Sequence, residues 1–430
     1  MEGGERAVML VETDGALLWL VPEERSHGAS MEHPHQHGAV FRVPLTHRSA
    51  GEDPAGEDPV GPMWVGGEVY RLVRGFVLKY VAGLVADKLK QVFEGGVTEG
   101  LVGITGPDPE EWAAPKTWKV PADARKVLLL IHGTFSSTKG CYGALGATPE
   151  GRAFLDEVLK KYDVVLGYDH RTLSLDPQKN ADDLLRCLLE LKLPAGTAID
   201  AVAHSRGGLV LRSFSERTLS RLDPDGRFSL KKAVLVGCPL GGTALAERDN
   251  WRKLLDLMTN LAAGLGRLVG RAFPVAGVLV EESIKTLGTL VFALADHGLD
   301  GENVPGLASM VPDGEFIREL NEAPVTDAAY YAVTSNFDLN LADLAPGLNR
   351  GVTVLLADRL ADGFMRVDND LVVDTVSMTY LGVVGLSVAG ALEFGPGESV
   401  YHTVYFLQPL ALEALDGWLH GSEVGEVNAY

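Results

Sequence analysis

Residues 199–211 read IDAVAHSRGGLVL and place Ser205 between an apolar run and a helix-like pattern. The apolar run predicts a buried strand, and the spacing of apolar residues over 209–217 predicts a helix. At such a strand-to-helix turn the serine hydroxyl projects above the sheet, and small residues two positions away on either side allow the turn to close. Ala203 and Gly207 occupy those two positions. The alternative interpretation is an ordinary tight turn.

The stretch AHSRGG, residues 203–208, resembles the nucleophile turn of the α/β-hydrolase family, and within it that of lipases and carboxylesterases. The resemblance implies an α/β-hydrolase fold and serine chemistry that needs no metal or organic cofactor. Alternation of strand-like and helix-like segments after residue 121 also favours a mostly parallel sheet with helices on both faces. The predicted strands cover 125–131, 162–168, 231–238, 330–334 and 352–357, and the predicted helices cover 149–161, 180–193 (with Asn180 as a candidate cap) and 408–419.

The sequence HGTF at 132–135 follows the first of these strands. In lipases an HG pair opens the loop that holds the oxyanion, so the resemblance implies that the backbone N–H groups of Thr134 and Arg206 are the oxyanion-hole donors. Phe135 is the less favoured substitute for Thr134. Phe135 and His204 are also expected to border the substrate. The alternative for HGTF is a plain glycine turn.

Serine hydrolysis requires an acid and a histidine, which in this fold follow the serine in that order. Asp370 lies in DNDLVV, residues 368–373, which resembles the N-D-G-x-V stretch of lipases except that Leu371 replaces the glycine. Asp370 is therefore the expected acid, with Asp368 and then Asp338 as rivals. Each of these could instead be a solvated turn aspartate.

The expected base is His402, in SVYHTVYF at 399–406, because the family places its histidine shortly before the last helix. His420 is a weaker candidate, and a histidine near a strand can also be purely structural. The resemblance thus implies a serine esterase or lipase that acts on apolar acyl esters through an acyl-enzyme. An amidase or acyltransferase with the same residues, or a non-catalytic binding protein on this fold, is the alternative.

Residues 247–320 interrupt the alternation with apolar, helical sequence. An insert at this place in an α/β-hydrolase usually forms a lid, although a subdomain that merely packs or dimerises would have a similar sequence. Two flanking segments also resemble lipase sequences, and the second of them, 307–321, supports the lid. The stretch 239–243 resembles the P-x-x-G-T turn of lipases, and 307–321 resembles the segment that returns from lid to sheet.

The division predicted from these patterns is an accessory region over 1–120 and a catalytic domain over 121–430. The accessory region is expected to contain a β-hairpin over 6–21, a flexible acidic loop over 50–59 and an amphipathic helix over 68–93. This helix or the lid could contact a membrane surface. Three histidines at every second position, His33, His35 and His37, could ligate a metal, but a solvated loop, which also carries His47, is the favoured interpretation.

The formal net charge of −20 opposes binding to nucleic acid. Three cysteines, which cannot all pair, fit a reducing compartment. The first residues, MEGGERAVML, are acidic where a secretory signal would be basic. We therefore expect a cytoplasmic protein with a small-molecule or lipid ester as substrate, and the oligomeric state is left open.

Overall fold

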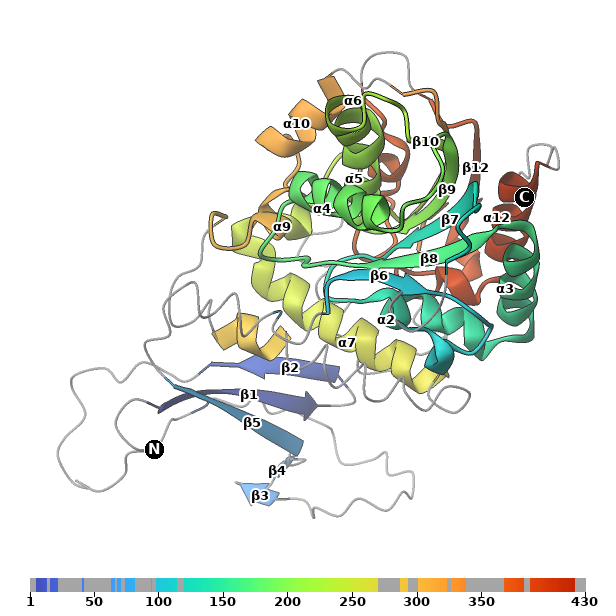
Figure 1. Cartoon of the computed structure of the whole chain (residues 1–430). Coiled ribbons are helices and arrows are strands. Elements are labelled where there is room, and N and C mark those ends of the chain that lie inside the picture. The colour runs from blue at the N-terminus through green and yellow to red at the C-terminus, as the bar shows by residue number, and fades with distance from the viewer. Residues whose placement is uncertain are drawn as a thin grey trace.

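The structure is a computed structural model. It describes residues 5–13, 16–21, 41, 63–65, 68–70, 74–81, 94, 98–113, 120–269, 287–292, 301–322, 326–337, 367–382 and 387–421. Most of these belong to a twisted sheet with helices on both faces, beside which lies a small separate sheet near the N-terminus (Figure 1).

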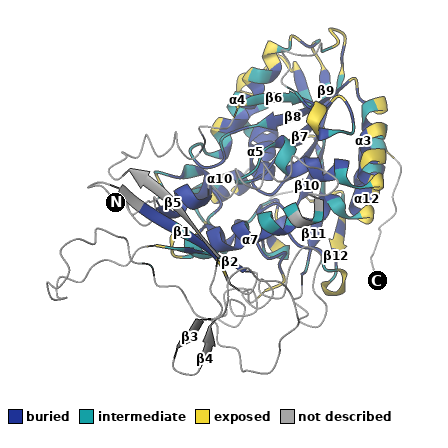
Figure 2. Cartoon of the chain, turned by 90° about the horizontal axis from the view of Figure 1, so that it is seen from below, coloured by how far each residue is buried: buried dark blue, intermediate teal, exposed yellow. Residues whose placement is uncertain are grey.

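The main sheet has seven strands in the order β12-β11-β10-β9-β7-β8-β6. All neighbouring pairs are parallel except β6 with β8, which are antiparallel. The central strands are buried on both faces, as their continuous apolar sequences predict (Figure 2). The strands are β6 (Gly100–Gly103), β7 (Lys126–Ile131), β8 (Val164–Asp169), β9 (Thr197–His204), β10 (Phe228–Val236), β11 (Ala329–Ser335) and β12 (Gly390–Phe394).

Helices α4 and α5 cover one face of this sheet, and α3 and α12 cover the other (Figure 1). Two of them begin at a side-chain cap followed by proline: the Thr148 hydroxyl accepts from Gly151 N, and the Asp176 carboxylate accepts from Lys179 N. The helices are α2 (Thr138–Tyr142), α3 (Pro149–Lys161), α4 (Pro177–Glu190), α5 (Gly207–Ser213), α6 (Leu219–Leu222), α7 (Trp251–Val269), α9 (Pro305–Ala308), α10 (Glu315–Glu322) and α12 (Pro409–His420).

The predicted α/β fold and mostly parallel sheet are confirmed. The helix predicted over 180–193 begins earlier, at Pro177, because Asp176 and not Asn180 is its cap. Asn180 lies inside the helix, where its Oδ1 accepts a hydrogen bond from Arg206. A local pattern could not distinguish the two polar residues, because the distant arginine determines what Asn180 does.

Near the N-terminus, β1 (Glu5–Thr13) and β2 (Ala16–Leu20) form the hairpin expected over 6–21. The prediction of an amphipathic helix over 68–93 is wrong for the residues of this segment that the structure describes. Residues there form β4 (Glu68–Tyr70), which pairs with β3 (Met63–Val65), and β5 (Arg74–Val81), which pairs antiparallel with β1. The aromatic and β-branched residues of RGFVLKYV favour a strand once a partner strand is available.

The boundary predicted at residues 120 and 121 falls too late. Strand β6 joins the main sheet beside β8, so this sheet already includes residues 100–103. Four residues that begin and end with glycine carry too little periodicity to predict a strand from sequence.

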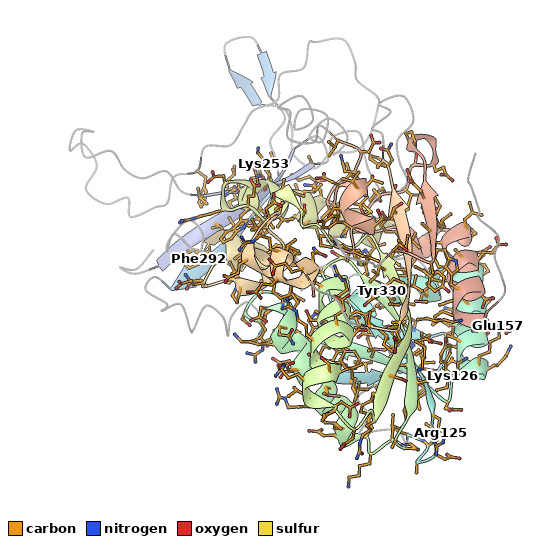
Figure 3. The ribbon with its side chains drawn as sticks, turned by 90° about the horizontal axis from the view of Figure 1, so that it is seen from above. Arg125, Lys126, Glu157, Lys253, Phe292 and Tyr330 are labelled. Atoms are coloured by element: carbon orange, nitrogen blue, oxygen red, sulfur yellow. The ribbon has the colours of Figure 1, made fainter. Side chains whose placement is uncertain are left out.

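Between β10 and β11 the structure contains α7, a helical segment at 287–292, α9 and α10, as expected for a helical insert. Arg125 and Lys126, at the start of β7, lie far from Lys253 of α7 (Figure 3). The insert is therefore near the carboxyl ends of the parallel strands. The acidic loop at 50–59, the four histidines of 33–47, the strand expected at 352–357 and Asp338 lie outside the described residues.

A buried ion pair between Arg212 of α5 and Glu216, four residues later, also contacts Asn321 of α10 in the insert. The Arg212 guanidinium contacts the Glu216 carboxylate at 2.8 and 3.0 Å and donates to Asn321 Oδ1 at 2.6 Å. Tyr330, which lies inside the molecule in Figure 3, donates to Glu216 Oε1. Because both charged side chains are at most 1% exposed, each depends on the other for neutralisation.

Replacing Glu216 with alanine is therefore expected to lower the free energy of unfolding by about 3–5 kcal/mol, since it leaves a buried guanidinium without its counter-charge. Urea titration measures this change. The double variant Arg212→Met/Glu216→Leu should lose much less stability, because neither charge remains. Equal losses in both variants would contradict the argument.

Candidate active site

Ser205 lies at the turn from β9 into α5 with a left-handed backbone, φ 55°. Its N–H donates to the carbonyl oxygen of Val236 at 2.9 Å, which fixes the turn against β10. A side chain at Gly207 would place Cβ 2.4 Å from the Ile131 carbonyl oxygen, so only glycine fits there. This is the strained strand-to-helix turn that the pattern around Ser205 predicts.

The structure brings together Ser205, His402 and Asp370. The Oγ of Ser205 lies 3.0 Å from Nε2 of His402, and Nδ1 of the same ring lies 2.8 Å from Oδ2 of Asp370. All three residues are buried, with Ser205 the most exposed at 7%. They form one continuous hydrogen-bonded chain from carboxylate to hydroxyl.

The Asp370 carboxylate accepts three further hydrogen bonds. The backbone N–H groups of Val372 and Val373 donate to Oδ1 at 3.1 and 2.8 Å, and the Tyr405 hydroxyl donates to Oδ2 at 2.9 Å. Burial and the neighbouring Asp370 raise the pKa of Tyr405 well above its usual value, so this hydroxyl keeps its proton. Sequence reasoning missed Tyr405, because nothing in the pattern separates it from Tyr401.

Leu371, which replaces the glycine of the family motif, has a left-handed backbone with φ 79°. The turn therefore keeps the shape that glycine would adopt without strain, and its N–H donates to Asn369 Oδ1 at 2.8 Å. The rival Asp368 is exposed. His420, the rival base, is on α12 beside Asp416 and takes no part in this chain of bonds.

The HGTF turn lies directly against the serine. A Cβ at Gly133 would stand 2.6 Å from Cβ of Ser205. Among the described residues, neither the Thr134 N–H nor the Arg206 N–H has a hydrogen-bond partner. The Phe135 N–H instead donates to Thr172 Oγ1 at 3.3 Å, which favours Thr134 over Phe135 as an oxyanion donor.

The expectation that His204 borders the substrate is wrong. Its ring is buried against His402, with centroids 4.8 Å apart, and Nε2 lies 2.9 Å from the carbonyl oxygen of His402. Burial, followed by the effect of His402, lowers the pKa of His204 to about 3. The neutral ring thus donates to this carbonyl and holds the loop that carries His402.

Two buried charged side chains hold the segments beside Ser205: sequence reasoning selected Arg206 only for its backbone N–H, and it missed Glu94. The Arg206 guanidinium donates to Leu175 O, Asn180 Oδ1 and Gly306 O. The Glu94 carboxylate accepts from the backbone N–H groups of residues 172–174 and from the Ser174 hydroxyl. Thr172 in turn accepts from Phe135, so Glu94 steadies the HGTF turn through one intermediate residue.

A cavity opens beside Ser205 and His402, and its remaining lining is mostly apolar. The Thr243 hydroxyl of the predicted P-x-x-G-T turn donates to Val372 O at 2.5 Å and ties this turn to the acid loop. The other lining residues are Thr134, Phe135, Pro239, Thr243, Leu254, Met258, Met310, Val372 and Val373.

The parallel sheet, the serine turn and the order serine, acid, histidine define the α/β-hydrolase fold, so the resemblance seen in the sequence is confirmed at the level of fold. The chain belongs to the family described as Domain of unknown function (DUF7379), whose model matches residues 99–420.

Several solved structures are similar. Lipase 1 from Pelosinus fermentans is 15% identical with a TM-score of 0.47, over 70% of this chain and 100% of that one. EstA from Clostridium botulinum is 11% identical with a TM-score of 0.44, over 75% and 92%. Staphylococcus hyicus lipase is 12% identical with a TM-score of 0.40, over 71% and 97%. No curated protein sequence matches significantly.

Within the described ranges, no group of three or more histidine, cysteine or acidic side chains is arranged to hold a metal ion. In the same part of the chain, every helix is too short or too polar to cross a membrane.

Stability should depend on pH through His204. The unfolded chain binds this proton near pH 6.5, whereas the native ring binds it only near pH 3. The contribution of neutral His204 to the free energy of unfolding is therefore complete above about pH 6.5. It is lost as the pH falls towards 3, by about 1.4 kcal/mol per pH unit. In urea titrations between pH 7 and 4.5, the stability of wild type relative to His204→Gln should decline at this rate. A difference that stays constant with pH would contradict the assignment.

Proposed function

We propose that this protein is a serine esterase that hydrolyses carboxylic esters with an apolar acyl group through an acyl-enzyme. The observation that carries the proposal is the hydrogen-bonded chain from Asp370 through His402 to Ser205, which ends at an apolar cavity. An imidazole nitrogen 3.0 Å from a serine hydroxyl is positioned to take its proton.

In the first step, Ser205 Oγ attacks the ester carbonyl carbon while His402 Nε2 accepts the hydroxyl proton. Asp370 holds the proton on Nδ1, which keeps Nε2 free as the acceptor and stabilises the imidazolium that forms. His402 then gives its proton to the leaving alcohol. A water molecule attacks the acyl-enzyme with the same base, releasing the acid and restoring Ser205.

Negative charge develops on the carbonyl oxygen in both steps. The N–H groups of Thr134 and Arg206 are the proposed donors to it, since both flank Ser205 and neither has a partner among the described residues. Removing one such donor in a serine hydrolase costs about 3 kcal/mol in the barrier. The Arg206 side chain and Glu94 would keep these two backbone segments in place.

The lining of the cavity supports an uncharged, apolar acyl group. Phe135, Leu254, Met258 and Met310 offer hydrocarbon or thioether surface, and apart from His402 the lining contains no ionisable side chain. A charged acyl group would lose its hydration there without a compensating partner.

The test is hydrolysis of p-nitrophenyl esters by wild type and by Ser205→Ala, His402→Ala and Asp370→Asn. We expect kcat/KM to fall by at least about 10³-fold in each variant, because each interrupts the same relay. Asp368→Asn is the matched control, since its carboxylate is exposed, and it should keep activity within about twofold. A folded wild type that cleaves amides or transfers acyl groups to alcohols, but hydrolyses no ester, would contradict the proposal.

A further inference from the structure

Helix α7 presents different residues on two opposite sides. Leu254 and Met258 are one turn apart and line the cavity beside Ser205. Asp256 and Asn260 follow them by two positions, which at about 100° per residue places them on the other side of the helix. The helix lies between β2 and the main domain, as Figure 1 and Figure 2 both show.

The side of α7 that faces β2 carries three buried polar residues: Asp256, Thr259 and Asn260 are 5%, 0% and 0% exposed. Buried polar groups destabilise a fold unless they form hydrogen bonds. Besides contacts within α7 itself, they bond to the hairpin. Asn260 accepts from Leu17 N at 2.9 Å and donates to Leu17 O at 2.7 Å.

Two more bonds come from the next residue on the same edge of β2. Trp19 N donates to Asp256 Oδ1 at 3.1 Å, and the Trp19 indole N–H donates to Thr259 Oγ1 at 2.8 Å. β2 is an edge strand, whose outward backbone groups occur on alternate residues. Side chains of α7 therefore bond the outward backbone groups of β2 that a further strand would otherwise bond.

The cavity under α7 is small. Its enclosed volume is about 20 Å³, so only the first carbons of an acyl group find enclosed space beside Ser205. An acyl chain longer than a few carbons therefore requires the wall formed by Leu254 and Met258 to move away from Ser205. Such a movement would stretch or break the hydrogen bonds that join α7 to β2.

We propose that the β1–β2 hairpin is a clamp that fixes α7 against the cavity and restricts the enzyme to short acyl groups, with Asn260, Thr259 and Asp256 as its positioning residues. This inference rests on the proposed esterase function. Long esters react only in the fraction of molecules with α7 displaced, so their kcat/KM scales with that fraction. Short esters react with α7 in place.

The experiment compares kcat/KM for p-nitrophenyl decanoate and p-nitrophenyl butyrate in full-length protein. Wild type should prefer butyrate. Asn260→Ala removes two hydrogen bonds of the clamp, so the decanoate-to-butyrate ratio should rise about tenfold, with butyrate changed less than about threefold. Thr259→Val, a milder change, should raise the ratio about threefold, and Thr259→Ser, which keeps the acceptor, should not.

Gln178→Ala is the matched destabilising control. Gln178 Nε2 also donates two hydrogen bonds, to Asp182 and Thr218, but on α4. The decanoate-to-butyrate ratio of Gln178→Ala should equal that of wild type. An unchanged ratio in both Asn260→Ala and Thr259→Val, or a wild type that prefers decanoate, would overturn the proposal.

Hydrogen exchange separates this proposal from the esterase assignment, because it needs no activity. The backbone amides of α7 should exchange faster in Asn260→Ala than in wild type, while those of α4 stay unchanged. Lack of ester hydrolysis in wild type would count against the proposed function alone. Unchanged exchange in α7 would overturn the clamp whatever the activity.

Discussion

The Asp370 carboxylate is fully buried and accepts four hydrogen bonds, and the rest of the active site depends on this constraint. A buried carboxylate is tolerated only when its oxygens are well satisfied. The two backbone donors fix the 370–373 turn, and the other two fix the His402 ring and Tyr405. With the ring held at Nδ1, its Nε2 faces Ser205 Oγ at 3.0 Å.

The parallel sheet makes that meeting possible, because the carboxyl ends of β7, β9, β10 and β11 lie at one edge. Close approach then dictates glycine. Gly237, which follows β10 with φ +56°, has the Tyr405 ring 2.8 Å and Asp370 Oδ2 3.1 Å from where its Cβ would be. Gly133 has the same role between the HGTF turn and Ser205. The loops of the candidate active site thus approach one another so closely that only glycine fits where they touch.

The sequence predicted those parts of the site that depend on local patterns. The Ser205 turn and the HGTF turn both have short-range signatures, and Asp370 could be chosen despite Leu371, which adopts the backbone shape of the absent glycine. Contacts between distant segments could not be predicted. They include the strand at 74–81, which needs β1 as its partner, the direction in which His204 points, and the anchoring of residues 172–174 by Glu94.

If the buried chain of hydrogen bonds from Asp370 activates Ser205, this serine reacts as a nucleophile. The most direct measurement is peptide-resolved mass spectrometry after incubation with a p-nitrophenyl alkylphosphonate, which traps an activated serine covalently. One adduct is expected, on the peptide that contains Ser205, and it should be lost in His402→Ala. An unlabelled wild type, or a phosphonate attached to another residue such as Ser377, would contradict it.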